Sequence, residues 1–344
     1  MPLDPDDLPA TVGSVAELDA LLARPSQALI DDLARLDGDL MILGVGGKMG
    51  PSLARLARAA CGKRVVAVAR FSEAGLRDEL EQSGIETISA DLLDRTALAA
   101  LPDVRNIVFM AGHKFGAAAD PGLTWAMNVH MPALVAERFA AARIVAFSTG
   151  CVYPFAPAPS AGCTEAVLPD PPGEYAMSCL GRERMFQYFS NKYSTPGRLF
   201  RLNYAIDLRY GVLHDIALKV RQGTPLDLAM GYVNVIWQGD ACAQALRLLR
   251  HCTTPTSPIN ITGPQCLSVR ALAHAFAKRL GRAPVLTGEE APSCWLNDSS
   301  EATRLFGPPL VPLERMLDWV ADWVARGGQS LGKPTKFEVR SGVY

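Results

Sequence analysis

Three evenly spaced glycines, Gly44, Gly47 and Gly50, are the part of this sequence best suited to binding a ligand. They follow a short apolar run at 40–43 and precede a helical pattern at 53–60, which predicts a turn between a strand and a helix. Glycine tolerates a tight turn and lets backbone N–H groups approach a pyrophosphate, whose charge the helix N-terminus favours. The spacing differs from the usual G-x-G-x-x-G, and an ordinary tight turn is the alternative interpretation.

The end of the next strand indicates which dinucleotide this turn would hold. Strand 64–69 is followed by Arg70, where a protein selective for NAD usually has Asp or Glu to bond the ribose 2′-hydroxyl. A basic residue suits the 2′-phosphate of NADP, so the sequence favours NADP, with NAD as the alternative. Ser72 and Lys48 are candidates to complete this pocket, and Met49 is expected to touch the cofactor from the same turn. A solvated arginine at a strand end is the other interpretation of Arg70.

Composition and charge exclude several classes of function. The 344 residues carry 34 basic and 35 acidic side chains without a long like-charged run, which argues against nucleic acid or an anionic membrane as a partner. No apolar stretch reaches the roughly 20 residues that span a bilayer, and the acidic N-terminus lacks a signal-peptide pattern. Eight scattered cysteines and five isolated histidines show no metal-ligand spacing. We therefore expect a cytoplasmic protein with reduced cysteines and no metal site.

The positions of these residues depend on alternating strand and helix patterns that begin at Leu40. Such alternation predicts a parallel sheet covered by helices on both faces, a doubly wound α/β fold of the Rossmann type. The segment 106–111 is almost wholly apolar, as expected of a strand buried on both faces. Strands are predicted at 40–44, 64–69, 85–88, 106–111, 143–148 and 198–203, and helices near 51–61, 73–83, 94–100, 122–142, 174–192 and 312–326.

The same patterns divide the chain into four parts. Ser14 and Glu17 are typical of a capping box at the start of a helix in the N-terminal segment. The tail is expected to pack on the body of the protein or on a second subunit. The parts are an N-terminal helical extension at 1–38, a dinucleotide-binding domain at 39–205 and 235–262, a smaller substrate region at 206–234 and 263–328, and the tail at 329–344.

Further motifs follow the glycine turn in a recognisable order. They are Asp91-Leu92 after the third strand, Ala111-Gly112 after the fourth, Asn128-Val129 in the next helix, and Ser148-Thr149 with Val152-Tyr153 at the end of the fifth strand. With Tyr175 beyond them, this ordered set resembles the extended short-chain dehydrogenases/reductases, the group that contains the NAD-dependent epimerases and dehydratases of sugars. The resemblance runs from about residue 40 to about residue 260.

The resemblance implies roles for these residues. Thr149 matches the family's catalytic Ser/Thr, and Tyr175 matches its catalytic tyrosine. In that chemistry the tyrosine hydroxyl exchanges a proton with a substrate hydroxyl or carbonyl while hydride moves to or from nicotinamide, and the threonine orients the same oxygen. The resemblance also places Gly44, Gly47 and Gly50 at the pyrophosphate, Asp91 and Leu92 against the adenine, Ala111 and Gly112 along the cofactor cleft, and His113, Ser148, Asn203 and Tyr204 at the substrate.

The sequence departs from the family where the tyrosine should be activated. The family motif is Tyr-x-x-x-Lys, but Cys179 occupies the lysine position after Tyr175, and a thiol cannot supply the missing cation. Lys114 is the better substitute, because the similar UDP-galactose 4-epimerases carry an Ala-Gly-x-Lys segment there. His113 is a second option, and Arg182 lies two helical turns beyond the tyrosine, about 10 Å along the axis. A plain loop charge at Lys114 and a packed aromatic at Tyr175 are the alternatives.

A second departure concerns the substrate. Nucleotide-sugar enzymes of this type usually carry an arginine before an aromatic-rich strand to hold the diphosphate, and Val233 lies near that place here. Asn203, Tyr204, Arg209 and Tyr210 lie where the substrate loop begins. A free sugar, a sugar acid or a similar polyol therefore fits better than a nucleotide sugar.

The sequence thus predicts an NAD(P)-dependent oxidoreductase, epimerase or dehydratase that acts on a carbohydrate-like hydroxyl of a small molecule. A catalytically silent NAD(P)-binding sensor or regulatory protein is the alternative. The glycine turn alone also resembles that of dihydrodipicolinate reductases, which use a basic residue there to touch NAD(P), but no other segment matches.

A homodimer is also expected, because in the resembling family helices equivalent to 122–142 and 174–192 pair across a two-fold axis. The apolar residues expected to supply that face are Trp125, Met131, Leu134, Val135, Phe139, Leu180, Met185 and Phe186.

Overall fold

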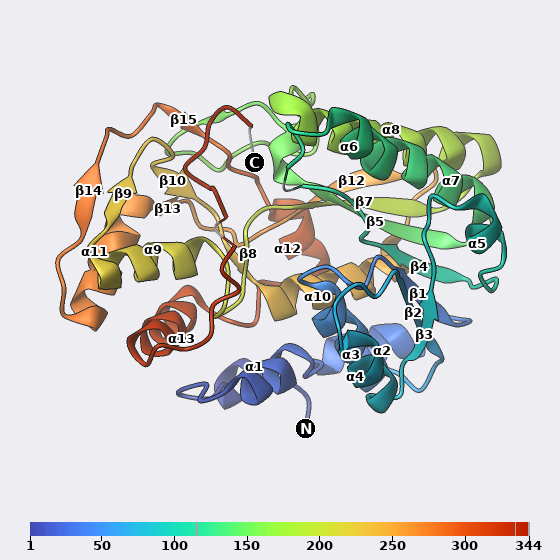
Figure 1. Ribbon diagram of the computed structural model, residues 1–344, viewed down its shortest axis with the longest axis horizontal. Helices are drawn as coiled ribbons and strands as arrows, with labels where there is room; N and C mark the ends of the chain where they lie inside the picture. Colours follow the sequence, from blue (N-terminus) through green and yellow to red (C-terminus); the bar gives the residue numbers. More distant parts are fainter. Residues whose placement is uncertain (115, 334, 343–344) are drawn as a thin grey trace.

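A seven-stranded parallel sheet forms the centre of the protein, as the computed structural model shows for residues 1–114, 116–333 and 335–342. The strand order is β12-β7-β5-β4-β1-β2-β3, and every neighbouring pair is parallel (Figure 1). The doubly wound α/β fold predicted from the sequence is confirmed. The strands are β1 (Leu40–Leu43), β2 (Val65–Ala69), β3 (Glu86–Ser89), β4 (Asn106–Phe109), β5 (Arg143–Thr149), β7 (Gly197–Leu202) and β12 (Ser257–Ile261).

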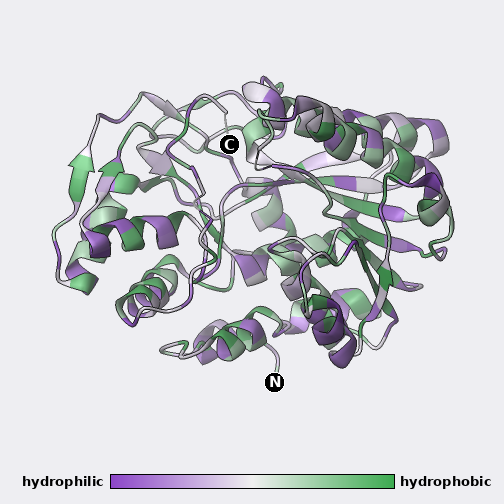
Figure 2. Cartoon of the chain, in the orientation of Figure 1, coloured by the Kyte–Doolittle hydropathy of each residue, from purple (hydrophilic) through white to green (hydrophobic). Residues whose placement is uncertain are grey.

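The central strands are buried on both faces. In β1, Leu40 and Ile42 pack into the core on one side of the sheet, while Met41 and Leu43 pack into the core on the other. A strand enclosed in this way needs no polar alternation, which explains the apolar runs in the sequence. Figure 2 shows the contrast between the mostly apolar strands and the helices of mixed polarity around them.

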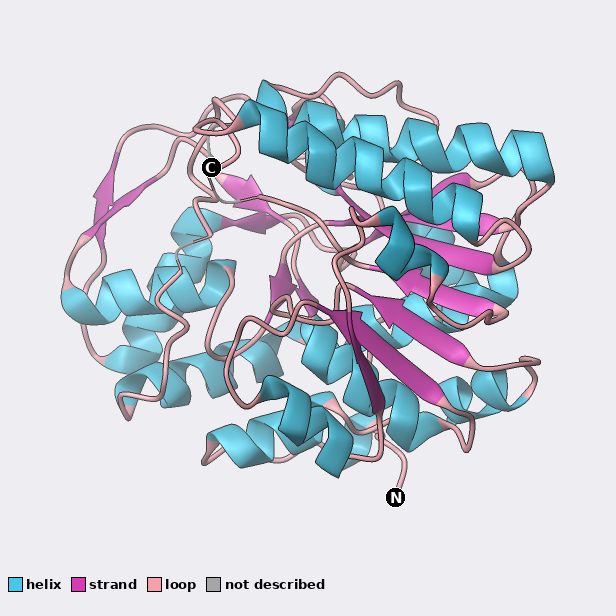
Figure 3. Cartoon of the chain, turned by 45° about the vertical axis from the view of Figure 1, so that its right-hand side comes forward, coloured by secondary structure: helices cyan, strands magenta, loops and turns pink. Residues whose placement is uncertain are grey.

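Two helical layers enclose the sheet (Figure 3). Apolar side chains of α2, α3, α4 and α10 share one core cluster with the sheet, and those of α5, α7 and α8 share the other. The helices are α2 (Gln27–Ala34), α3 (Gly50–Ala60), α4 (Leu76–Gln82) and α10 (Gln238–Arg247) on the first side, and α5 (Arg95–Ala99), α6 (Pro121–Trp125), α7 (Met131–Arg138) and α8 (Gly173–Tyr193) on the second.

Two elements differ from the sequence prediction. Strand β12 was not predicted, because Pro258 interrupts a five-residue segment, but β12 is the last strand in the sheet order, where a missing N–H is tolerated. The single helix predicted at 122–142 is wrong. It is divided into α6, a π-helical turn at Ala126–His130, and α7, which ends at Arg138. Pro132 has no N–H to donate, so the wider turn before it avoids a break in the chain of hydrogen bonds.

A second, smaller core lies beside the sheet domain. It combines buried side chains of α9 (Val212–Gln222), α11 (Val269–Leu280) and α13 (Leu313–Ala325) with those of short strands from the C-terminal half. Val233 is completely buried in this cluster. The sequence predicted α13 but neither α9 nor α11.

The N-terminal segment joins the two cores. Helix α1 (Val15–Leu22) buries Leu18 and Leu22 in the smaller core, whereas α2 packs against the sheet. The hydroxyl of Ser14 accepts a hydrogen bond from the N–H of Glu17 at 3.2 Å. The Glu17 carboxylate accepts from the N–H of Gly13 at 2.7 Å, one residue before the position expected in a capping box.

The C-terminal tail runs between the two parts of the molecule (Figure 1). Its Leu331 N–H bonds to the carbonyl of Arg209, and Phe337 is buried in the smaller core. Arg340 donates to the carbonyl and hydroxyl oxygens of Ser293 at 2.5 and 3.0 Å. The tail therefore packs on the body of its own chain.

Within the described residues, no helix is long and apolar enough to cross a membrane. The same residues contain no group of three or more His, Cys, Asp or Glu side chains arranged to hold a metal ion.

Candidate active site

Two adjoining cavities open at the carboxyl ends of the strands, where the strand order reverses between β1 and β4. The outer cavity has a volume of about 230 Å³ and lies between β2, β3 and the π-helical turn. The inner cavity has a volume of about 280 Å³ and lies between the glycine turn, α8 and the start of α9. Both are lined by Gly44, Gly47 and Met110, so the two cavities form one cleft.

The three glycines of the turn do different things. Gly44 has a φ of +91°, and a Cβ on it would lie 2.4 Å from the backbone nitrogen of Ala111. A Cβ on Gly50 would lie 2.1 Å from the carbonyl oxygen of Val45. A Cβ on Gly47 would meet no protein atom closer than 3.9 Å, although this residue lines both cavities. The first and third glycines thus allow the turn to pack, and the second leaves room in the cleft.

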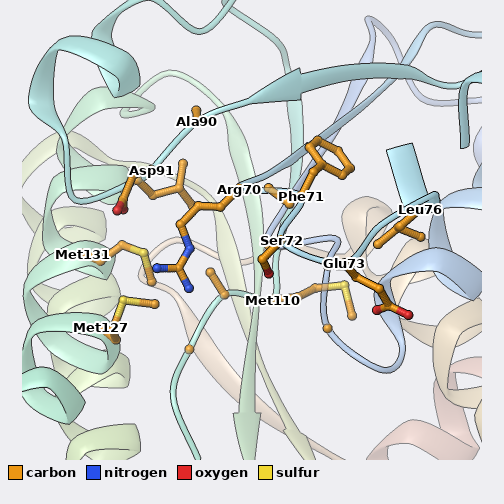
Figure 4. A pocket seen from close by; sticks show the side chains of 17 residues that line it. Arg70, Phe71, Ser72, Glu73, Leu76, Ala90, Asp91, Met110, Met127 and Met131 are labelled. Atoms are coloured by element: carbon orange, nitrogen blue, oxygen red, sulfur yellow. The ribbon is translucent and has the colours of Figure 1, made fainter. Parts of the chain in front are cut away.

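The outer cavity contains the residues predicted to hold the adenosine part of a dinucleotide. The side chain of Arg70 extends from the end of β2 toward Met127 and Met131, as Figure 4 shows. Glu73 is turned away from it in the same view. The remaining predicted residues on this wall are Ser72, Asp91, Leu92, Ala111 and Gly112.

Lys48 does not line the outer cavity with Arg70, so the prediction that it completes the 2′-phosphate pocket is wrong. Its ammonium group enters the inner cavity, 3.5 Å from the carbonyl oxygen of Ala205 and 4.5 Å from the ring centre of Tyr210. The sequence alone could not show this, because a side chain in a turn can leave on either side of the cleft.

The inner cavity brings together the predicted reacting groups. Thr149 ends β5, Tyr175 lies in the first turn of α8, and Lys114 lies on the loop after β4. The ammonium of Lys114 lies 5.7 Å from the centre of the Tyr175 ring. The other predicted residues on this wall are Lys48, Met49, Gly50, Ser148, Asn203 and Tyr204.

The protonation of this pocket is set mainly by burial. Burial raises the pKa of Tyr175 well above its ordinary value, and the nearby thiols of Cys179 and Cys151 raise it further, while Arg182 lowers it. Burial also raises the pKa of the Cys179 thiol and lowers the pKa of the Lys114 ammonium. Tyr175 is therefore a neutral phenol at neutral pH, able to donate a proton but not to accept one unaided.

His113 lines neither cavity, so the structure gives no support to its predicted substrate contact. Its backbone is held by Asn128, which accepts from the N–H and donates to the carbonyl, both at 2.8 Å.

Arg182 is buried beneath the cleft instead of lining it. It donates to the carbonyl of Phe147 at 2.8 Å and to the amide oxygen of Asn128 at 2.7 Å. Asn128 in turn donates to Ser178, whose hydroxyl donates to the carbonyl of Tyr175. The sequence marked Asn128 only as part of a motif, and the structure shows that it links the π-helical turn, the loop after β4 and α8.

Two of the predicted substrate contacts have polar groups already engaged by the protein. The hydroxyl of Ser148 donates to Glu183 at 2.6 Å. The amide of Asn203 donates to Asn234 and to the carbonyl of Trp295 at 3.1 and 3.3 Å. Sequence reasoning missed Thr335, a wall residue that comes from the tail, because nothing near it in the sequence indicates a site.

With this geometry described, the chain can be compared with known proteins. Residues 40–206 match the NAD dependent epimerase/dehydratase family. A search of curated proteins gave no match.

Solved structures of this kind share the fold across most of their length. A UDP-glucose 4-epimerase from Thermotoga maritima, solved with UDP-glucose, has a TM-score of 0.70 at 15% identity and covers 84% of this chain and 99% of its own. A dTDP-glucose 4,6-dehydratase from Streptomyces venezuelae, solved with NAD, has a TM-score of 0.70 at 20% identity. The match covers 84% of this chain and 97% of the dehydratase. A UDP-glucose 4-epimerase from Thermus thermophilus, in complex with NAD, has a TM-score of 0.67 at 18% identity. The match covers 83% of this chain and 98% of the epimerase. The family model covers just under half of this chain, and these solved structures, at 20% identity or less, show that it shares their fold.

The different packing around the glycines predicts different costs of substitution. Gly44→Ala should lower the free energy of unfolding by about 2–5 kcal/mol, because it combines a positive φ with a backbone clash. Gly47→Ala should change it by less than about 1 kcal/mol, because its Cβ meets open space. Urea denaturation of both variants beside wild type measures the difference. Equal costs would show that the turn does not have this geometry.

Proposed function

We propose that the protein is an NAD(P)-dependent oxidoreductase, epimerase or dehydratase acting on a hydroxyl of a small carbohydrate-like molecule. The main observation is that one continuous cleft joins the glycine turn to a cavity holding both Thr149 and Tyr175. The family resemblance implies catalytic roles for both of these residues. The solved relatives with NAD bound support a nicotinamide cofactor.

The cleft fits a dinucleotide at several points. Gly47 leaves the space that a side chain would fill, and backbone N–H groups at the start of α3 favour a pyrophosphate. Arg70, Asp91 and Leu92 would hold the adenosine end in the outer cavity. In bound form, the nicotinamide supplies hydride transfer.

In this proposal the protein supplies proton transfer and orientation. The hydroxyl of Tyr175 would exchange a proton with the reacting oxygen, and the hydroxyl of Thr149 would orient that oxygen. The Thr149 oxygen accepts from the N–H of Cys151 at 3.2 Å, and a hydroxyl that accepts can still donate its own proton. Lys114 would supply part of the positive charge that Cys179 cannot. Arg182, held below, is the other candidate because it already lowers the pKa of Tyr175.

The substrate we propose is not a nucleotide sugar, although the solved relatives named above act on UDP- or dTDP-glucose. The inner cavity, at about 280 Å³, is just below the usual range of about 300–1,000 Å³ for ligand pockets. Val233, near the family's diphosphate-binding position, is buried in the smaller core and offers no charge.

A catalytically silent cofactor-binding protein is the second candidate. The observation that favours it is the environment of Tyr175, whose pKa is raised and whose usual lysine partner is replaced by a buried cysteine. Such a protein would bind dinucleotide without turnover.

Activity measurements with Tyr175→Phe separate these two functions. Cofactor reduction is followed by absorbance over a panel of sugars and sugar acids. The variant should lose about 100-fold or more in kcat/KM while its cofactor affinity stays unchanged, because only the transferred proton is removed. Tyr188→Phe, on the exposed side of the same helix, is the matched control and should be fully active. Equal turnover of both variants would refute the role of Tyr175, and cofactor binding without turnover by wild type would favour the silent function.

The preference for NADP over NAD is proposed from the position of Arg70. A charged hydrogen bond to the 2′-phosphate contributes about 1.5–3 kcal/mol, or roughly tenfold to a hundredfold in affinity. Arg70→Ala should therefore reduce the ratio of NADPH to NADH affinity by that factor, measured by titration of cofactor fluorescence. Arg95→Ala, an exposed arginine outside the cavity, should leave the ratio unchanged. An unchanged ratio in Arg70→Ala, or tighter binding of NADH by wild type, would contradict the preference.

A homodimer is proposed through α6 and α8, but with a different set of residues from that predicted. Five of the expected side chains, Met131, Leu134, Val135, Phe139 and Phe186, are buried inside the monomer. The exposed large apolar residues on these helices are Leu123 (42% exposed), Trp125 (40%), Met177 (38%), Tyr188 (55%) and Tyr193 (39%).

A charge on this face should separate the subunits. Sedimentation of wild type at micromolar concentration should give a dimer, and Tyr188→Glu should shift it to monomer because a carboxylate would be buried without a partner. Val285→Glu, on β14 (Val285–Thr287), replaces another exposed apolar residue, 43% exposed and outside this face, and should leave the dimer intact. A wild-type monomer would contradict the proposal.

A further inference from the structure

Lys48 is a charged group in the cleft that the proposed chemistry leaves unused. It enters the inner cavity from the glycine turn and stands over the ring of Tyr210. Within the described part of the chain, its one hydrogen bond is a long one of 3.5 Å to the carbonyl of Ala205. An ammonium group has three protons to donate, so this contact leaves donors for a ligand.

The wall of the inner cavity is positively charged. Its described residues include two lysines, Lys48 and Lys114, and no aspartate or glutamate. Among the described residues, no carboxylate oxygen lies within 4.0 Å of the Lys48 ammonium. The Lys48 ammonium is therefore not compensated by a carboxylate on the described wall of this cavity.

The acidic groups nearest to Lys48 are engaged elsewhere. Asp207 pairs with Arg209 at 2.9 Å and also accepts from the Arg209 N–H. Asp215, on α9, accepts from both the N–H and the hydroxyl of Thr335. These carboxylates raise the pKa of the Lys48 ammonium from a distance, and each already accepts hydrogen bonds from other groups.

Burial makes this ammonium sensitive to pH. Desolvation lowers the pKa of Lys48 to about 8, while Asp207, Cys242 and Asp215 raise it and Arg209 lowers it. The neighbouring His214 and Tyr210 complete the titratable groups around it. At pH 7 the amine is mostly protonated, so an anionic ligand would meet a charged and poorly hydrated partner, which strengthens the attraction.

We propose that the inner cavity takes an anionic substrate, a hydroxy acid of the sugar-acid type, whose carboxylate Lys48 binds while its hydroxyl lies at Thr149 and Tyr175. This assignment rests on the proposed function, because it gives the substrate class of the same site. Both ends of the molecule must fit within one cavity of about 280 Å³. A short acid therefore fits better than an extended one.

Matched acid and neutral ligands test this assignment. Glucuronate with glucose, and galacturonate with galactose, are titrated by calorimetry into the protein saturated with NADPH. Wild type should bind the acids at least tenfold more tightly than their neutral partners. Lys48→Met should lose tenfold to a hundredfold in affinity for the acids only, since the ion pair is worth about that much. Lys48→Arg should recover part of the loss, and Lys278→Met, an exposed lysine on α11, should change nothing.

The pH dependence provides an independent check. From pH 7 to pH 9 the affinity of wild type for the acids should fall about tenfold, as a group with a pKa near 8 loses its proton. Lys48→Met should lack this component, and an unchanged pH dependence in this variant would contradict the role of Lys48.

Three results would overturn the assignment. They are equal binding of acids and neutral sugars by wild type, no binding of either acid, or a Lys48→Met variant that weakens NADPH binding but not acid binding. Failure of the proposed function is recognised separately, because wild type would then show either no NADPH binding by fluorescence or NADPH binding without turnover in the activity panel. The same acid titrations on the cofactor-free protein would still compare wild type with Lys48→Met.

Discussion

A buried ion pair between Glu183 and Arg201 fixes the relative position of the elements that carry Tyr175 and Thr149. Glu183, on α8, is completely buried, and its two oxygens accept from Arg201 of β7 at 2.9 and 2.6 Å. The same carboxylate accepts from Ser148 of β5. Tyr175 belongs to the helix and Thr149 to the strand, so the pair aligns them. Removing either charge would leave the other buried and unpaired, at a cost of about 3–5 kcal/mol.

The network extends past this pair and joins the sheet edge to the smaller part of the molecule. Arg201 donates to the hydroxyl of Tyr153 at 2.6 Å, and that hydroxyl donates to Asn260 of β12 at 2.9 Å. Asn260 donates to the carbonyls of Cys163 and Asp298. Buried polar groups that are satisfied in this way specify one arrangement of the elements around them. The geometry of the site is therefore set in advance by these buried hydrogen bonds.

The sequence predicted those features that depend on local pattern. Apolar runs gave six of the seven sheet strands, and the glycine spacing located the turn, because both follow from backbone requirements of single segments. β12 was missed because Pro258 obscures a short edge strand, and the π-helical turn because Pro132 acts only within the folded helix. The direction of Lys48 could not be predicted either, since it depends on which wall of the cleft the side chain packs against.

The residues of the proposed dimer face and of the cavity wall could not be predicted from local sequence pattern either. Apolar spacing marks a helix face, but whether Phe139 and Phe186 point to the sheet or to solvent depends on the layer beneath them. Thr335 reaches the cavity from the far end of the chain, held by Asp215, with no local signal of its role. Resemblance supplied the roles of Thr149 and Tyr175, and the structure supplied their shared cavity.

The central claim, that the glycine turn and the Thr149–Tyr175 pocket form one cofactor and substrate cleft, is tested most directly by a crystal structure of the protein with NADPH. The account predicts the adenosine against Arg70 and Asp91, the pyrophosphate over Gly47, and the nicotinamide ring in contact with the inner cavity beside Tyr175. A cofactor bound elsewhere, or one whose nicotinamide points away from Tyr175 and Thr149, would contradict it.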